Sequence, residues 1–99
     1  MIMKNQELNL TMLRFAPKLN NQTKLSSELE ISVGKVNYIL KALIDKGFMK
    51  IENFATHKNK KQYKYLLTPK GIEEKITLTK KFIKRKKDEY EQLQRELGE

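Results

Sequence analysis

The sequence predicts a mainly α-helical fold with one small β-hairpin, an α+β chain of 99 residues. Apolar residues recur at helical spacing in three short segments before Gly47, and the pattern becomes extended directly after it. From Pro69 onward, apolar residues recur with heptad spacing almost to the end of the chain. A chain of this length can bury one modest core. We therefore expect a single compact unit, with helices and hairpin in residues 1–68 and a long helix in residues 69–99.

The first helix is expected from Gln6 to Ala16, because apolar side chains form a wide stripe there. The stripe contains Leu8, Leu10, Met12, Leu13 and Phe15. Pro17 is expected to end this helix, since a proline removes a backbone hydrogen bond and its ring crowds the preceding turn. Asn20 and Asn21 follow as a polar turn.

Two short helices joined by a tight turn are expected next, over residues 24–30 and 33–46. The first carries leucines four residues apart on one side, Leu25 being the first of them. Ser32 is a good N-cap for the second helix, and Gly47 is a suitable stop just past its end. The pair is a helix-turn-helix, and three helices completed by Gly47 can share one core.

Polar side chains occupy the outward face of the second helix of this motif. The opposite, apolar face consists of Val33, Val36, Ile39, Leu40, Leu43 and Ile44. In a helix-turn-helix the second helix lies in the major groove of DNA, while the first crosses the backbone. The candidate DNA-binding residues are Ser32, Gly34, Lys35, Asn37, Tyr38 and Lys41, where glycine removes bulk at the point of closest approach. Periodicity alone also fits a solvated amphipathic helix, and the flanking elements decide against that alternative.

An antiparallel hairpin is expected after Gly47, with strands at residues 48–54 and 62–67 that are rich in aromatic and branched side chains. Positive charge gathers at the connection between them and on the second strand. A basic hairpin beside a helix-turn-helix is a wing, expected to bind phosphates or to enter the minor groove. The candidate wing residues are His57, Lys58, Asn59, Lys60, Lys61 and Lys64. A solvated charged loop would explain the lysine content, but not its concentration at one tip.

The last helix is expected from Pro69 to about Leu97, with Thr68 as its N-cap. Its seam, with steps of four and three residues, consists of Ile72, Ile76, Thr79, Ile83, Lys86, Tyr90, Leu93 and Leu97. Alone, such a helix would be marginal and would expose its stripe, so the seam predicts a coiled-coil-like homodimer. The candidate dimerisation residues are Ile72, Ile76, Ile83, Tyr90, Leu93 and Leu97.

Charge is segregated along this last helix. The basic middle contains Lys75, Lys80, Lys81, Lys84, Arg85, Lys86 and Lys87, and the acidic end contains Asp88, Glu89, Glu91, Glu96 and Glu99. The basic middle either approaches DNA or pairs with the acidic end of an antiparallel neighbour. The sequence leaves both alternatives open, together with the parallel or antiparallel orientation of the dimer helices.

The formal net charge of +9 and a pI near 9.8 are typical of a protein that meets a polyanion, and nucleic acid is the first candidate. A membrane surface is the competing partner. The sequence contains no apolar run long enough to span a bilayer, no signal-peptide pattern and no lipidation motif. We therefore expect no membrane contact and a cytoplasmic location.

Enzymatic function is disfavoured by the residue content. The chain has no cysteine and one histidine, which excludes a disulfide scaffold, a thiolate zinc site and a cysteine nucleophile. Paired carboxylates in an apolar setting and a glycine-rich phosphate loop are both missing from the sequence. His57 stands in a polar, basic loop, where a surface residue is far more common than a general base. We expect no catalysis, no cofactor and no metal site.

Three blocks of sequence resemble a known family: ISVGKVNYILKALIDKGFMKIENF, KNKKQYKYLLTPKGIEEKITLT and RKKDEYEQLQREL. They look like the short MarR-family winged helix-turn-helix regulators associated with exopolysaccharide (EPS) gene clusters, and the resemblance covers roughly residues 20 to 97. It implies a dimeric protein that binds double-stranded DNA and regulates transcription of polysaccharide synthesis or export genes.

The chain departs from the wider MarR pattern in two respects. It has a single helix after the wing, which argues against a small-molecule effector, because the helical lobe that shelters such ligands is largely missing. Its wing reads HKNKK without an arginine, so its lysines are expected to give mainly phosphate contacts. The alternative function is a protein-interaction or RNA-binding adaptor of transcription elongation, which would show only weak, sequence-independent affinity for DNA.

Overall fold

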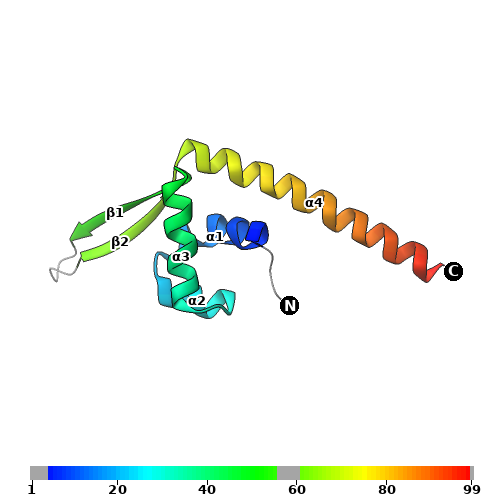
Figure 1. The fold of residues 1–99 in the computed structure, drawn as a ribbon, viewed down its shortest axis with the longest axis horizontal. Coiled ribbons are helices and arrows are strands. Elements are labelled where there is room, and N and C mark those ends of the chain that lie inside the picture. Colours follow the sequence, from blue (N-terminus) through cyan, green and yellow to red (C-terminus); the bar gives the residue numbers. More distant parts are fainter. Residues whose placement is uncertain (1–4, 56–60, 99) are drawn as a thin grey trace.

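The computed structural model describes residues 5–55 and 61–98. The helices of this part are α1 Asn5–Leu19, α2 Gln22–Leu29, α3 Val33–Asp45 and α4 Pro69–Leu97, and the strands are β1 Met49–Ala55 and β2 Lys61–Leu67. The hairpin lies on one side of α3, and the free end of α4 points away on the other side (Figure 1). The predicted fold class, mainly helical with a small hairpin and a long C-terminal helix, is confirmed. None of the helices in these ranges has the length and apolar content needed to cross a bilayer.

The end of α1 differs from the prediction. The helix continues through Pro17 to Leu19, so the prediction that Pro17 ends it is wrong. A proline in the last turn gives up its own hydrogen bond, and the residues around it keep theirs. The helix ends at Asn20, which has a left-handed backbone with φ of 50°. Its backbone N–H donates to the carbonyl oxygen of Ala16 at 2.9 Å, and its side-chain amide donates to that of Pro17 at 3.1 Å.

The caps of α2 explain both of its ends. The side-chain oxygen of Asn21 accepts a hydrogen bond from the backbone N–H of Lys24 at 3.0 Å, so α2 begins at Gln22 rather than at Lys24. At the other end Glu30 adopts a left-handed conformation with φ of 56°. This conformation turns the chain sharply and carries it directly into the cap of α3.

The predicted caps of α3 are both present. Ser32 Oγ accepts a hydrogen bond from the backbone N–H of Lys35 at 3.0 Å. Gly47 follows the helix with φ of 79°, a conformation that favours glycine. One residue of the predicted apolar face does not reach the core: Val33, in the first turn of α3, is 45% exposed. The first turn of α3 extends past the other elements of the core, so Val33 has no neighbour among the described residues that buries it.

One hydrophobic core joins the helices and the base of the hairpin. Its buried side chains are Leu8, Leu10, Met12, Leu13, Ala16, Leu25, Leu29, Val36, Ile39, Leu40, Leu43, Met49, Tyr65, Leu78 and Phe82. The last two belong to α4, which packs against α1. The first three helices share this core, as predicted, and α1 also packs against the side of α4 that carries Leu78 and Phe82.

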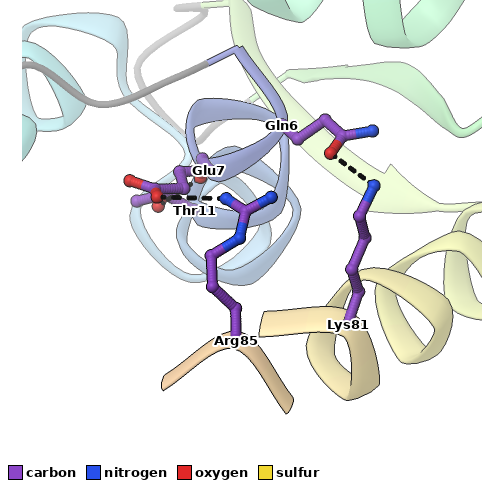
Figure 2. A network of polar contacts seen from close by, with 5 residues as sticks. All are labelled: Gln6, Glu7, Thr11, Lys81 and Arg85. Atoms are coloured by element: carbon purple, nitrogen blue, oxygen red, sulfur yellow. Dashed lines mark hydrogen bonds and ion pairs between the residues drawn. The ribbon is translucent and has the colours of Figure 1, made fainter. Parts of the chain in front are cut away.

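Polar contacts fasten the same part of α4 to α1 (Figure 2). The ammonium of Lys81 donates to the side-chain oxygen of Gln6 at 2.8 Å. One guanidinium nitrogen of Arg85 lies 3.8 Å from the carboxylate of Glu7. The guanidinium carbon of Arg85 also lies 5.0 Å from the ring centroid of Phe82. Beyond Arg85 every described residue of α4 is exposed, so this half of the helix projects from the body (Figure 1).

The base of the hairpin is held by the junction between α1 and α2. The strands pair in antiparallel register from Met49 with Leu67 to Ala55 with Lys61. The backbone N–H of Tyr65 donates to the side-chain oxygen of Asn20 at 2.9 Å. The side-chain amide of Gln22 donates to the Tyr65 hydroxyl at 3.2 Å. These contacts fix the orientation of the hairpin relative to the helix-turn-helix.

The start of α4 closes tightly onto the start of the hairpin. Thr68 Oγ1 accepts from the backbone N–H of Gly71 at 3.0 Å and caps the helix, as predicted. A Cβ at Gly71 would lie 1.8 Å from the carbonyl oxygen of Phe48, so only glycine fits there. The backbone N–H of Thr68 donates to that same Phe48 carbonyl at 3.1 Å. The direction of α4 is therefore determined at its first turn.

Candidate nucleic-acid interface

Helix α3 has one buried face and one free face. Of the predicted contact residues, Ser32, Gly34, Lys35, Tyr38 and Lys41 are exposed, and Asn37 is half-buried. They lie on the same helix, opposite the face that carries Val36, Leu40 and Leu43 into the core. Because the core holds α3 through its buried side chains from Val36 to Leu43, the polar face is presented on a rigid element.

Tyr38 projects from this face, and its side chain is 69% exposed. The ammonium of Lys35 lies 5.7 Å from the centroid of the Tyr38 ring, within the range of a cation–π contact. The pair combines a positive charge, an aromatic ring and a hydroxyl. This combination suits a surface where phosphates and base edges lie close together.

The first turn of α3 is capped by Ser32 and has no side chain at Gly34. Ser32 Oγ is used as the acceptor of the cap, which leaves its hydroxyl proton free to be donated to a partner. A Cβ at Gly34 would meet only Ser32 Oγ, at 3.9 Å, so the fold has room for a side chain there. Because glycine is a poor helix former, nothing local favours it at this position. The missing side chain leaves a flat helix start that another molecule can approach closely.

Asn37 stands at the edge of the free face. Within the described part of the chain, its side-chain amide makes no hydrogen bond. An asparagine side chain can both accept from and donate to the major-groove edge of adenine. Asn37 is therefore the side chain of this face best suited to base readout.

The wing is described only in part. His57, Lys58, Asn59 and Lys60 lie outside the described residues, and Lys61 begins β2. Lys64 is exposed and pairs in register with Glu52 on β1. The carboxylate of Glu52 lies 3.8 Å from the ammonium of Lys50. Lys64 therefore keeps its charge available on the outer part of the hairpin.

The structure adds two exposed residues that sequence reasoning missed. Tyr63 is 53% exposed on the hairpin face that carries Tyr65, but farther from the body. The two-residue period of the strand would have placed both tyrosines on one face. Lys24 is exposed in the first turn of α2, the helix that crosses the DNA backbone in this motif. Periodicity on that helix gave no sign of a contact residue.

The predicted dimerisation residues form an exposed apolar stripe along α4. Their exposure rises from 49% at Ile72 to 88% at Leu97. They occupy a different side of the helix from Leu78 and Phe82, which are buried against the body. An exposed apolar stripe of this length, interrupted only by Thr79 and Lys86, is typical of an interaction surface.

Solved structures share this arrangement of helices and hairpin. A protein from Streptococcus mutans matches with a TM-score of 0.67 and 20% identity, over 84% of this chain and 82% of that one. MarR from Staphylococcus aureus, in complex with salicylate and kanamycin, matches with a TM-score of 0.64 and 25% identity, over 92% of this chain and 59% of that one. A MepR variant from S. aureus bound to an oligodeoxyribonucleotide matches with a TM-score of 0.61 and 20% identity, over 97% and 75%.

The sequence matches no protein-family model and no curated protein. At the identities of these structures, the likeness concerns the fold. In it, α2 and α3 form the helix-turn-helix, β1 and β2 form the wing, and α4 follows as the long C-terminal helix. The chain has the winged helix-turn-helix fold of MarR-type transcriptional regulators.

Proposed function

We propose that this chain is a sequence-specific, double-stranded-DNA-binding transcriptional regulator. The observation that carries the proposal is the free polar face of α3, held rigidly by the core and flat at Gly34. A helix-turn-helix of this form inserts its second helix into the major groove. The net charge of +9 supports the same partner, because neutralising phosphates supplies much of the affinity for DNA.

The residues of α3 take distinct roles in this proposal. Asn37 and Tyr38 read base edges, while Lys35 and Lys41 reach a base or a phosphate. Ser32 donates its hydroxyl proton to a phosphate beside the flat helix start. The wing lysines and Lys24 of α2 hold the backbone on either side.

The active form in this proposal is a homodimer joined by α4. Six apolar residues of one stripe are exposed in the single chain, and a second copy is the partner that a heptad seam of this length implies. A two-fold dimer presents two copies of α3 to a pseudo-palindromic site, with half-sites about one helical turn apart.

The regulated genes follow from the sequence resemblance alone, which points to exopolysaccharide-type gene clusters. The positions of the DNA sites that the protein binds in the genome test this assignment.

Recovery and sequencing of genomic DNA bound to the purified protein tests the proposal. A regulator is expected to enrich a few sites that share one inverted repeat, and to protect that repeat as a defined footprint. Uniform recovery of genomic DNA, without a shared sequence, would instead favour the adaptor of transcription elongation. Enriched sites far from polysaccharide genes would support the function as a regulator but contradict the assignment to those genes.

A further inference from the structure

The apolar stripe of α4 has two halves with different surroundings. The first half, from Ile72 to Ile83, lies on the anchored part of the helix, beside α1 and β2. The second half, from Tyr90 to Leu97, lies on the projecting part, where every described residue is exposed. An isolated helical end of this kind is marginal in water. It needs a surface to lie on, and the first half offers one.

Two open hollows adjoin the first half of the stripe. One has a volume of about 340 Å³ and is lined by Leu67, Ile72 and Ile76 together with Lys75, Thr79 and Lys80. The other, of about 540 Å³, lies between α1 and α4, where Leu10 and Phe82 line it. Three cationic side chains also line the second hollow: Arg14, Lys75 and Lys86. Both hollows are mainly apolar, and both have cationic side chains at the rim.

The projecting half of α4 has the complementary chemistry. Leu93 and Leu97 continue the apolar stripe, with exposures of 64% and 88%. Glu89 and Glu96 lie seven residues apart along one edge of that stripe, on the same edge as Lys75. An apolar segment with an acidic edge fits an apolar groove with a basic rim.

We propose that two copies of α4 pair antiparallel, so that the projecting half of each copy fills the hollows of the other. This inference rests on the proposed homodimer and specifies its geometry. The helices cross at their midpoint between Lys84 and Arg85. Ile72 then faces Leu97 of the second copy, Ile76 faces Leu93, Thr79 faces Tyr90 and Ile83 faces Lys86. Every seam position of one copy has a partner in the other.

The antiparallel register also pairs opposite charges. Glu96 of the second copy comes beside Lys75, and Glu89 of the second copy comes to the hollow rimmed by Arg14 and Lys86. On the other edge Lys80 meets Lys87 of the second copy, both exposed, where solvent and salt screen their repulsion.

A parallel pair has neither advantage. It sets Lys86 against Lys86 inside the seam and brings Lys75 beside Lys80 at its edge, which joins like charges. It also pairs the two projecting ends only with each other and leaves the hollows beside α1 empty. The antiparallel pair therefore brings the acidic end of each copy beside Lys75 and the basic rim of the other copy.

Disulfide cross-linking distinguishes the orientations, because the wild-type chain has no cysteine. Ile76→Cys and Leu93→Cys are made separately, and both positions are at least half exposed, so neither substitution disturbs the core. In the antiparallel dimer, Ile76 of one copy lies about 25 Å along the axis from Ile76 of the other, well beyond disulfide reach. Under oxidation each variant alone is expected to stay unlinked, and their equilibrated mixture to form a linked dimer.

Each outcome has one meaning when light scattering is run on the same samples. Linked dimers of either single variant would demonstrate parallel pairing and overturn the inference. Dimers that link in no sample would show that the interface lies elsewhere, again against it. A monomer in every sample would reject the proposed homodimer itself. Thr79→Cys mixed with Tyr90→Cys provides a second pair, expected to link in the same way.

Discussion

Helices α3 and α4 each have one face in the core and one face free, but the free faces differ in kind. The free face of α3 is polar and ends in a bare first turn at Gly34. The free surface of α4 carries an apolar stripe, from Ile72 to Leu97, beside charged residues such as Lys80 and Glu96. A polar face can remain in water until a charged partner arrives, whereas an apolar stripe costs free energy while it stays exposed.

The position of the polar face of α3 is fixed within the single chain, because the core holds that helix. The apolar stripe of α4 is covered only in the proposed dimer. Substitutions on the two helices should therefore affect folding, dimerisation and DNA binding to different extents.

Phe82→Ala is expected to lower the free energy of unfolding by about 3–5 kcal/mol, because Phe82 is buried against the body. Leu93→Ala, in the projecting half, is expected to lower stability only through the dimer, so its effect grows with protein concentration. Urea unfolding at two protein concentrations measures both. A concentration-independent loss at Leu93 would place that residue in a core of the single chain.

Ile76→Asp combined with Leu93→Asp is expected to abolish the dimer, since the two new carboxylates would face each other across the proposed apolar seam. Loss of the second half-site should weaken binding to the full DNA site by about 100-fold or more. Thr77→Asp with Gln92→Asp is the matched control, because it adds the same charge at exposed positions outside the seam. Light scattering and a DNA titration are the measurements. If the double seam variant still dimerises, the dimer interface lies on an element other than α4.

Asn37→Ala and Tyr38→Ala are expected to cost roughly 1–3 kcal/mol each on the specific DNA site and little on random DNA. Both side chains lie outside the core, so the free energy of unfolding should change little. Titration of both DNA sequences at one salt concentration measures the difference. Equal losses on the two sequences would remove these residues from base readout.

Removal of a wing lysine is expected to weaken specific and random DNA alike, because a phosphate contact carries no sequence information. Each of Lys58→Ala, Lys60→Ala and Lys61→Ala should reduce the slope of log affinity against log salt by about one. Binding measured over a series of salt concentrations gives that slope. If the triple variant keeps the wild-type slope, the wing does not contact DNA.

Gly34→Ala is expected to raise the stability of the fold and to lower the affinity for DNA. The added methyl group would meet only Ser32 Oγ, at an ordinary contact distance of 3.9 Å, so the helix should gain up to about 0.5–1 kcal/mol of stability. Affinity for DNA should nevertheless fall, because the side chain enters the space that a duplex would occupy. Gly71→Ala is the contrasting variant: its Cβ would collide with the Phe48 carbonyl, so stability should fall. Unchanged DNA affinity in Gly34→Ala would mean that this turn stays clear of the duplex.

Local patterns predicted the elements well, because caps and periodicity act over a few residues. Ser32, Gly47 and Thr68 mark helix ends in the structure as they do in the sequence. Pro17 was misjudged, since a proline near the end of a helix is tolerated when a following residue, here Asn20, supplies the stop. The exposure of Lys24 and Tyr63 was not predicted, because exposure depends on packing between distant segments.

The sequence by itself determined the order of the elements, the polar face of α3 and the apolar stripe of α4, since each follows from the spacing of residues along one helix. Only the tertiary structure decided that a second side of α4, with Leu78 and Phe82, belongs to the core. It also decided that Gly71 must be glycine and that Tyr65 ties the hairpin to Asn20. Periodicity tells which residues share a face. Which face meets which neighbour depends on contacts between residues far apart in the chain, and these exist only when the elements are packed.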